Sequence, residues 1–570
     1  MFVQGRGTAE RTYDAIVVGS GISGGWAAKE LTEKGLRTLV LERGRDVKHG
    51  DYPTAMKESW EFAGRNRLST ADLAQQEKQA RTGYTTHPAS AHWFVNDVEN
   101  PYSEVQRFDW MRGYHVGGRS LLWGRQSYRW SDLDFEANAH DGHGVDWPIR
   151  YKDLSPWYDY VERFAGISGS RDGLPQLPDG QFLPPMQMNC LEEQVKGRIA
   201  KSFGGRAMII GRTANLTQPH NGRGTCMYRN RCIRGCPFGA YFSSNSATLP
   251  AAYATGRLTL RPFSIVTELV YDPKTRRATG VRIRDAQTNE TSEYFARVIF
   301  LCASAIASTF ILLNSKSETF PNGFGNESGE LGHNLMDHHF KVGANGLSED
   351  FGDRFYKGQR PNGIYIPRFR NLDARSAQKD YVRGFGYQGS ASRENWARGI
   401  KEMSAFGADL KADLIAPGPW RFGIGSWGEC LPYHENRMYL SDTVKDKWGL
   451  PTVTFDCGWK TNELNMRKDM MNSAAEMCEA AGLKNVTPFD DVTNSAPGNC
   501  IHEMGTARMG RDPKTSVLNG WNQVHSALNV FVTDGACMAS ASCVNPSLTY
   551  MALTARACDR AVSEINRRNL

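Results

Sequence analysis

The sequence lacks the features that mark membrane-spanning, exported or nucleic-acid-binding proteins. No run of about 18 apolar residues is present, so no segment is predicted to cross a bilayer as a helix. Lysine and arginine form no runs, and a net charge of +7 is small for 570 residues, which argues against binding of nucleic acid. Residues 1–11 contain neither the apolar core of a secretory signal nor a twin arginine. We therefore expect a cytoplasmic protein, or a periplasmic one if a partner subunit carries it out by co-export.

The composition is that of a globular protein with more than one core. Hydrophobic residues make up 40% and aromatic residues 11% of the sequence, which are ordinary values. A chain of 570 residues exceeds the usual size of a single domain. Twelve cysteines are spread widely. Those in apolar or small-residue runs, such as Cys302, Cys537 and Cys558, are typical of reduced core thiols.

A strand–helix–strand unit is predicted near the start of the chain. Residues 15–18 form a short apolar run typical of a buried parallel strand, and residues 26–31 have helical spacing. A second apolar run, residues 38–41, ends at Glu42. A carboxylate at this position can accept hydrogen bonds from the ribose hydroxyls of a bound dinucleotide.

Three glycines between the first strand and the helix have the G-x-G-x-x-G spacing of a dinucleotide site. Gly19 allows the tight turn, Gly21 lets the backbone approach a pyrophosphate, and Gly24 lets the helix pack closely on the strand. The helix N-terminus then offers free N–H groups and a positive dipole end to the phosphates. This motif alone does not distinguish NAD from FAD.

The rest of the chain indicates a second domain inserted into the first. Residues 258–303 alternate as strands do, and a helix rich in small residues follows at 303–313. Residues 341–494 are less regular and rich in Trp, Tyr and Gly, whereas from 495 onward strand and helix patterns return. We predict a nucleotide-binding domain formed by residues 1–340 and 495–570, and a substrate-binding domain formed by residues 341–494.

Several later segments resemble the glucose-methanol-choline (GMC) oxidoreductases. Residues 117–124 (GGRSLLWG) resemble the segment that lies along the flavin ring, and residues 302–308, 332–338 and 534–535 resemble three further family segments. His502, which begins His-x-x-Gly-Thr, and Asn545, which begins Asn-Pro-x-Leu-Thr, resemble the sugar-oxidising branch of that family.

The resemblance implies an α/β fold in which a Rossmann-like FAD-binding domain carries an inserted α+β substrate domain, as in p-hydroxybenzoate hydroxylase. Leu122 stands where pyranose 2-oxidases carry a histidine bonded to the flavin, so we expect non-covalent FAD. The cofactor contacts that motif and resemblance imply are Gly19, Gly21, Ser23, Gly24, Glu42, Arg43, Gly117, Gly118, Ser120, Val266, Ala303, Asp534, Gly535, Asn545 and Pro546.

His502 and Asn545 are the predicted catalytic pair. Flavin-dependent alcohol oxidation moves a hydride to the flavin, and the hydroxyl proton must pass to a base, for which an imidazole is suited. By resemblance, His502 is that base and Asn545 hydrogen-bonds the same hydroxyl. Gln388 and Glu429 lie in polar, aromatic-rich stretches of the predicted substrate domain, so we expect them to contact the substrate.

A loop at residues 220–240 contains three closely spaced cysteines, Cys226, Cys232 and Cys236. Thiolates at such spacing suit an iron–sulfur cluster. Three of them can hold a 3Fe-4S cluster, and a fourth ligand from elsewhere would permit a 4Fe-4S cluster. Bacterial sugar dehydrogenases of the GMC family carry such a loop and pass electrons through it. A zinc site completed by His220, a disulfide and free thiols are the alternatives.

Together these features predict an FAD-dependent sugar or glycoside dehydrogenase, most similar to glucoside 3-dehydrogenases, which oxidise C3 of a glucosyl unit to a ketone. The expected partners are a sugar or glycoside substrate, a cytochrome c or other electron acceptor, and a small subunit bearing an export signal. The alternatives are a pyranose or C-glycoside oxidase that forms hydrogen peroxide, a gluconate- or fructose-type flavoprotein subunit, an NAD(P)-dependent reductase and a zinc-loop binding module.

Overall fold

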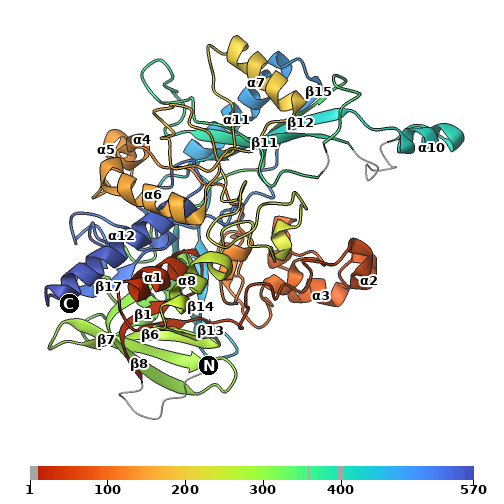
Figure 1. Cartoon of the computed structure of the whole chain (residues 1–570). Helices are drawn as coiled ribbons and strands as arrows, with labels where there is room; N and C mark the ends of the chain where they lie inside the picture. Colours follow the sequence, from red (N-terminus) through yellow and green to blue (C-terminus); the bar gives the residue numbers. More distant parts are fainter. Residues whose placement is uncertain (1–10, 357, 395–402) are drawn as a thin grey trace.

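The computed structural model describes residues 11–356, 358–394 and 403–570, which form two main sheets (Figure 1). One is a mixed eight-stranded sheet with the order β16-β17-β8-β1-β2-β5, to which the β6–β7 hairpin is joined through β8. The other is a six-stranded sheet with the order β15-β9-β12-β11-β10-β4. The α/β class with a Rossmann-like unit and a second sheet domain is therefore confirmed.

The predicted strand–helix–strand unit is β1 (Thr12–Val18), α1 (Ile22–Glu33) and β2 (Thr38–Leu41). β1 pairs in parallel with β2 on one side and with β8 (Thr291–Leu301) on the other. Burial on both faces explains why these strands are short apolar runs without alternation.

The end of the chain returns to this first sheet. β17 (Ala527–Val532) pairs in parallel with β8, and α12 (Ser547–Asn566) packs against α1. β16 (Gln523–Val524), β5 (Leu258–Arg261), β6 (Ser264–Asp272) and β7 (Arg277–Asp285) complete the sheet. The patterns predicted before residue 340 and after residue 495 thus belong to one body.

The second sheet is wholly antiparallel and is covered by α7 (Cys190–Ser202) and α11 (Thr461–Ala480). Its strands are β4 (Ile209–Ile210), β9 (Val342–Ser348), β10 (Ile364–Ile366), β11 (Phe385–Arg393), β12 (Trp420–Gly428) and β15 (Lys484–Asp490). Because β4 and α7 precede residue 341, the chain enters this body earlier than the sequence pattern suggests. The exact domain boundaries stay a prediction.

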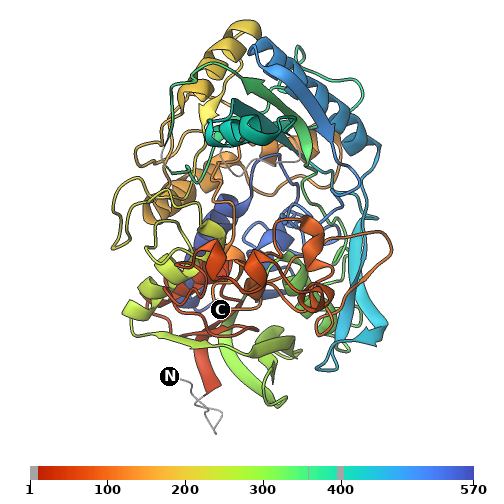
Figure 2. The ribbon, with the colours of Figure 1, turned by 90° about the vertical axis from the view of Figure 1, so that its right-hand side faces the viewer.

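A small third sheet and several helices surround these bodies. β13 (Arg437–Lys445) and β14 (Pro451–Asp456) form a hairpin to which β3 (Ser103–Glu104) adds in parallel. The remaining α-helices are α2 (Ala63–Asn66), α3 (Thr70–Gln75), α4 (Asp132–Phe135), α5 (Ala137–Asp141), α6 (Tyr151–Ala165), α8 (Leu249–Ala254), α9 (Ala305–Asn314) and α10 (Gly407–Ile415). α10 and the α2–α3 segment project from the same side of the molecule (Figures 1 and 2). No helix in the described ranges is long and apolar enough to span a bilayer.

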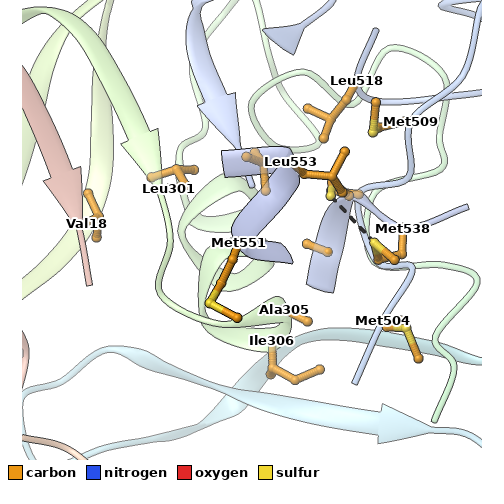
Figure 3. Close-up of a cluster of buried hydrophobic side chains, with 14 of the residues drawn as sticks. Val18, Leu301, Ala305, Ile306, Met504, Met509, Leu518, Met538, Met551 and Leu553 are labelled. Carbon is orange, nitrogen blue, oxygen red and sulfur yellow. Dashed lines mark hydrogen bonds between the residues drawn. The ribbon is translucent and has the colours of Figure 1, made fainter. Parts of the chain in front are cut away.

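The core unites the two ends of the chain. Figure 3 shows Val18 of β1 and Leu301 of β8 in one buried cluster with Met551 and Leu553 of α12. Met504 belongs to the same cluster and is fully buried. Since Met504 lies two residues after His502, this packing anchors the segment that carries the predicted base.

Candidate active site

A cavity of about 1810 Å³ lies between the two main bodies of the protein. It is lined by the α1 N-terminal turn on one side and by residues of β11 on the other. This volume exceeds the range of about 300–1,000 Å³ typical of small-ligand sites, so the cavity has room for a dinucleotide together with a substrate.

Most of the predicted cofactor residues line this cavity. Three of the fifteen do not: Gly24, Gly117 and Pro546. The twelve that do are Gly19, Gly21, Ser23, Glu42, Arg43, Gly118, Ser120, Val266, Ala303, Asp534, Gly535 and Asn545. Leu122, which replaces the flavin-linking histidine of pyranose 2-oxidases, also lines the cavity.

The glycines of the first turn fit a bound pyrophosphate. Gly19 has a φ of +93°, and a Cβ there would lie 2.6 Å from the Cys302 carbonyl oxygen. A Cβ on Gly24 would lie 2.0 Å from the Gly19 carbonyl oxygen, so Gly24 serves the close packing of α1 on β1. At Gly21, the N-cap of α1, a Cβ would meet nothing within 4 Å, and no side chain caps the helix. The open space and free N–H groups at this position fit a phosphate group.

Glu42 is placed at the same end of the sheet. Its carboxylate accepts hydrogen bonds from the backbone N–H of Ser20 (3.2 Å) and of Gly44 (2.9 Å), and from the Ser20 hydroxyl. Burial raises the pKa of Glu42, although these hydrogen bonds oppose the rise. Oε2 accepts both bonds from Ser20, whereas Oε1 accepts only the bond from Gly44 and so retains a lone pair for a ribose hydroxyl.

The segment that resembles the flavin-side loop forms a tight turn beside this site. Gly117 has a φ of +87°, and its N–H donates to the Ser20 hydroxyl oxygen (2.9 Å). Ser304, which stands where the family segment has glycine, has a φ of +82° and a ψ of 158°. That region is strained for any residue with a Cβ.

The predicted catalytic pair comes together at the cavity wall. His502 Nε2 lies 3.5 Å from the amide nitrogen of Asn545. Gln388, on β11, donates through its own amide to Asn545 Oδ1 (2.8 Å), which turns the Asn545 nitrogen toward the imidazole. All three residues line the cavity.

The tautomer of His502 follows from its second neighbour, His338. His338 Nε2 lies 3.2 Å from the Ala541 carbonyl oxygen, which can only accept, so Nε2 carries the proton. Burial lowers the pKa of His338 to about 4, so this ring is neutral and its Nδ1 is an acceptor. His502 Nδ1, 2.9 Å from His338 Nδ1, must therefore donate. This leaves the lone pair of His502 on Nε2, facing the cavity.

A buried carboxylate fixes the backbone of the same segment. Asp337 accepts hydrogen bonds from the backbone N–H groups of His502 (3.0 Å) and Cys500 (3.1 Å). Burial, with the charge of Glu503, raises the pKa of Asp337 to about 7. Glu503 in turn pairs with Arg119 at 2.9 Å. The pKa of His502 is held well below its usual range by burial and by the neighbouring His338 and Arg119.

Glu429 is not among the residues that line the cavity. Its side chain is fully buried, and Oε1 accepts a hydrogen bond from Arg383 at 2.7 Å. This placement gives no support to the predicted substrate role, because the carboxylate is fully buried in an ion pair with Arg383 and does not line the cavity. A polar stretch of sequence around a glutamate is compatible both with a buried ion pair and with a substrate-binding residue.

His338 and Asp337 also belong to the site but were not among the predicted site residues. Both lie in residues 332–338, a segment that the family resemblance singled out, so a signal was present. Their partner His502 is 164 residues away from His338, and only the fold brings the two rings together.

The cysteine loop lies against the flavin-side turn. Three thiols of this loop are partly exposed: Cys226, Cys232 and Cys236. Burial is the largest cause of a raised pKa at Cys226, and the neighbouring Cys232 and Cys236 raise it further. The Tyr241 hydroxyl lies 2.6 Å from the carbonyl oxygen of Leu121 and 3.2 Å from that of Cys232. Ile233, inside the loop, lines the cavity.

Two of the alternatives for this loop do not agree with the geometry. All twelve cysteines are free, so no disulfide is formed. Within the described ranges, the single set of three histidine, cysteine or acidic ligand atoms within 4.8 Å of one another is His338, Cys500 and His502, so Cys226, Cys232 and Cys236 do not form a compact ligand group. His220 directs Nε2 at the Arg163 carbonyl oxygen (2.7 Å), so the zinc tetrad is not assembled.

The chain is similar to GMC oxidoreductases over most of its length. GMC oxidoreductase family models match residues 13–340 and 432–554. The chain is 28% identical to 2-methyl-1,2-propanediol dehydrogenase of Mycolicibacterium austroafricanum, over 97% of this chain and 95% of that protein. It is 26% identical to the fructose dehydrogenase large subunit of Gluconobacter japonicus (97% and 98%) and 26% identical to 6'''-hydroxyparomomycin C oxidase of Streptomyces lividus (96% and 90%).

The fold is similar to that of pyridoxine 4-oxidase from Mesorbium loti, with a TM-score of 0.60, 15% identity, and coverage of 96% of this chain and 98% of that one. The two family models together span both ends of the chain, where the dinucleotide turn and the His502–Asn545 pair lie. The chain belongs to the GMC oxidoreductase family and is an FAD-dependent oxidoreductase acting on CH–OH groups.

Proposed function

We propose that this protein is an FAD-dependent sugar or glycoside dehydrogenase that oxidises a secondary hydroxyl of a glucosyl unit. The observation that carries the proposal is the lone pair of His502 Nε2, which faces the cavity 3.5 Å from Asn545. Bound FAD would supply the hydride acceptor, at its N5 atom. Gly19, Gly21 and Glu42 would hold its dinucleotide part, and Gly118, Ser120 and Gly535 would lie on the flavin side.

His502 accepts the hydroxyl proton at Nε2 as the hydride leaves the carbinol carbon. Its Nδ1–H bond to His338 keeps Nε2 unprotonated before the reaction. The Asn545 amide, held by Gln388, donates to the same hydroxyl oxygen and orients it. A low pKa keeps His502 in its basic form over a wide pH range.

A sugar suits the substrate side of the cavity. Gln388, Trp427 and Phe340 all line the cavity, which therefore presents an amide and two aromatic rings to a substrate. Hydroxyl-rich rings need such donors and acceptors next to apolar walls. Fructose dehydrogenase, one of the relatives, acts on a sugar. The choice of C3, giving a 3-keto glycoside, rests on the family resemblance of the sequence.

We further propose that Cys226, Cys232 and Cys236 hold a 3Fe-4S cluster through which electrons leave. The support is the position of the loop, because Tyr241 joins Cys232 to Leu121 of the flavin-side turn. Three arginines of the loop, Arg229, Arg231 and Arg234, would offset the charge of the cluster. A cytochrome c or similar acceptor, and a small subunit with an export signal, would then be the partners.

His502→Ala tests the proposed reaction. We expect this variant to retain non-covalent FAD and to lose most of its turnover, because no base remains at the hydroxyl. His143→Ala, at an exposed histidine, is the matched control and should behave as the unmodified enzyme. Near-normal flavin reduction by a sugar in His502→Ala would refute the assignment. Yellow colour that stays with the acid-precipitated protein would refute non-covalent binding.

An oxidase is the second candidate, because a relative is named for oxidation of an aminoglycoside. Stoichiometric oxygen uptake and hydrogen peroxide during turnover would favour it. Iron and acid-labile sulfide near zero in anaerobically purified protein would remove the cluster and, with it, the proposed electron exit.

A further inference from the structure

Cys500, His338 and His502 form a compact group of metal-ligand atoms, which we name the Cys500–histidine cluster. His338 Nδ1 and His502 Nδ1 are 2.9 Å apart, and Cys500 Sγ lies 3.4 Å from His502 Nδ1. All three ligand atoms lie within 4.8 Å of one another. The thiol takes no part in the proposed reaction, although Cys500 lines the cavity.

The surroundings of the cluster are those of a metal site. His338 donates its Nε2–H to the Ala541 carbonyl, so its Nδ1 lone pair is directed at the cluster. The Trp427 indole N–H donates to Cys500 Sγ at 3.1 Å, which opposes the rise in the pKa of this thiol that burial and Asp337 cause. Asp337 binds the backbone N–H groups of both Cys500 and His502 and places a carboxylate beside them. In metalloproteins, neighbouring groups likewise orient the ligand residues by hydrogen bonds to them.

We propose that the Cys500–histidine cluster binds a thiophilic divalent cation such as Zn²⁺ or Cd²⁺, and that the bound cation stops alcohol oxidation. The ligands would be the two Nδ1 atoms and the Cys500 thiolate, with the fourth position open to the cavity. Bond lengths of about 2.0–2.3 Å place tetrahedral ligand atoms roughly 3.3–3.6 Å apart. Cys500 and His502 are close to that spacing, and the two histidine rings would separate by a few tenths of an ångström.

Binding would disable His502 through its tautomer, a step that rests on its proposed role as the base. The Cys500 thiol releases its proton to solvent. The cation displaces the Nδ1 proton of His502 to solvent, and Nε2 takes up a proton from solvent, so the ring stays neutral. A neutral imidazole coordinated at Nδ1 carries its single proton on Nε2. That atom then cannot accept the proton of the substrate hydroxyl, although the substrate still fits. Inhibition should therefore lower kcat and leave KM unchanged.

The test is a Cd²⁺ titration of the holoenzyme in which two signals are followed. The ultraviolet band of the cadmium–thiolate bond reports binding, and anaerobic flavin reduction by a sugar reports activity. In the unmodified enzyme we expect both to change over the same Cd²⁺ range and to be reversed by a chelator. Cys500→Ala and Cys500→Ser should need at least tenfold more Cd²⁺ for half-inhibition and should lose part of the band. Cys190→Ala, a partly exposed thiol on α7, is the control and should match the unmodified enzyme.

Equal Cd²⁺ sensitivity of the unmodified enzyme and both Cys500 variants would overturn the inference. The inference would also be overturned if the band were lost in the Cys500 variants but Cd²⁺ had no effect on flavin reduction in the unmodified enzyme. The proposed function fails independently, if His502→Ala reduces its flavin normally without any metal. The Cys500 variants retain FAD if they are folded, so their flavin content separates loss of the metal site from loss of the fold.

Discussion

Replacement of Glu429 by glutamine should reduce stability and leave sugar binding unchanged. Glu429 and Arg383 are almost wholly enclosed, with side-chain exposures of 0% and 2%. Arg383 also pairs with Asp141, so the guanidinium keeps one carboxylate when the other is neutralised. Because Glu429 does not line the cavity, Glu429→Gln removes no group that could contact a substrate.

The magnitude follows from the burial of the pair. Removing one partner of a buried ion pair destabilises a protein by about 3–5 kcal/mol. Since Arg383 retains Asp141, we expect a value near the lower end, about 3 kcal/mol. For a body of roughly 150–250 residues this corresponds to a fall of about 6–12 °C in the unfolding midpoint.

The assay compares thermal unfolding with steady-state kinetics. Glu349→Gln is the matched control, because Glu349 pairs with Lys484 on the surface of the same sheet and should show no measurable shift. We expect Glu429→Gln to unfold at lower temperature with an unchanged KM for the sugar. A raised KM together with an unchanged unfolding midpoint would show that Glu429 binds substrate, which would refute this reasoning.

Three further predictions concern the cofactor turn, backbone strain and acid stability. Gly21→Ala should leave the unfolding midpoint of the FAD-free protein unchanged but weaken FAD binding. Gly24→Ala should destabilise both the FAD-free and the FAD-bound protein, because its Cβ would lie 2.0 Å from a carbonyl oxygen. Equal effects of the two variants on FAD titration and on unfolding would contradict this. Ser304→Gly should raise the unfolding midpoint, by a gain of about 1 kcal/mol, because glycine relieves the strained backbone; an unchanged or lower midpoint would argue against strain. Burial lowers the pKa of His115 from 6.5 to about 4, so its contribution to stability is lost as pH falls below 6.5. The free energy of unfolding of His115→Leu, measured with denaturant, should therefore fall by about 2 kcal/mol less between pH 7 and pH 5 than that of the unmodified enzyme. Equal falls in the two proteins would show that His115 does not cause the pH dependence.

The parts of the fold that the sequence predicted are those encoded by local patterns. β1, α1 and β2 follow from two apolar runs, a helical spacing and the glycine turn, all within about 30 residues. β17 and α12 lie after residue 495, where strand and helix patterns return in the sequence. β4 and α7 join the second sheet from before residue 341, and no local pattern signals such a long-range pairing.

The site residues also differ in whether a local sequence pattern or a long-range contact places them. His502 and Asn545 lie in recognisable motifs, and the fold places His502 Nε2 3.5 Å from the Asn545 amide nitrogen. Glu429 had equally suggestive polar surroundings, but its partner Arg383 is 46 residues away and encloses it. His338 acts on His502 through a contact between two distant segments, which the sequence order does not reveal.

The measurement that tests the central claim most directly is anaerobic reduction of the bound flavin by glucose and by methyl glucoside. The methyl group blocks oxidation at C1, so a dehydrogenase of secondary hydroxyls should bleach the oxidised-flavin band equally well with both sugars, and NMR should identify a ketosugar. Bleaching by glucose alone would show C1 chemistry and contradict the proposed glycoside oxidation. Bleaching by neither sugar would contradict the proposal that the site oxidises a glucosyl unit at all.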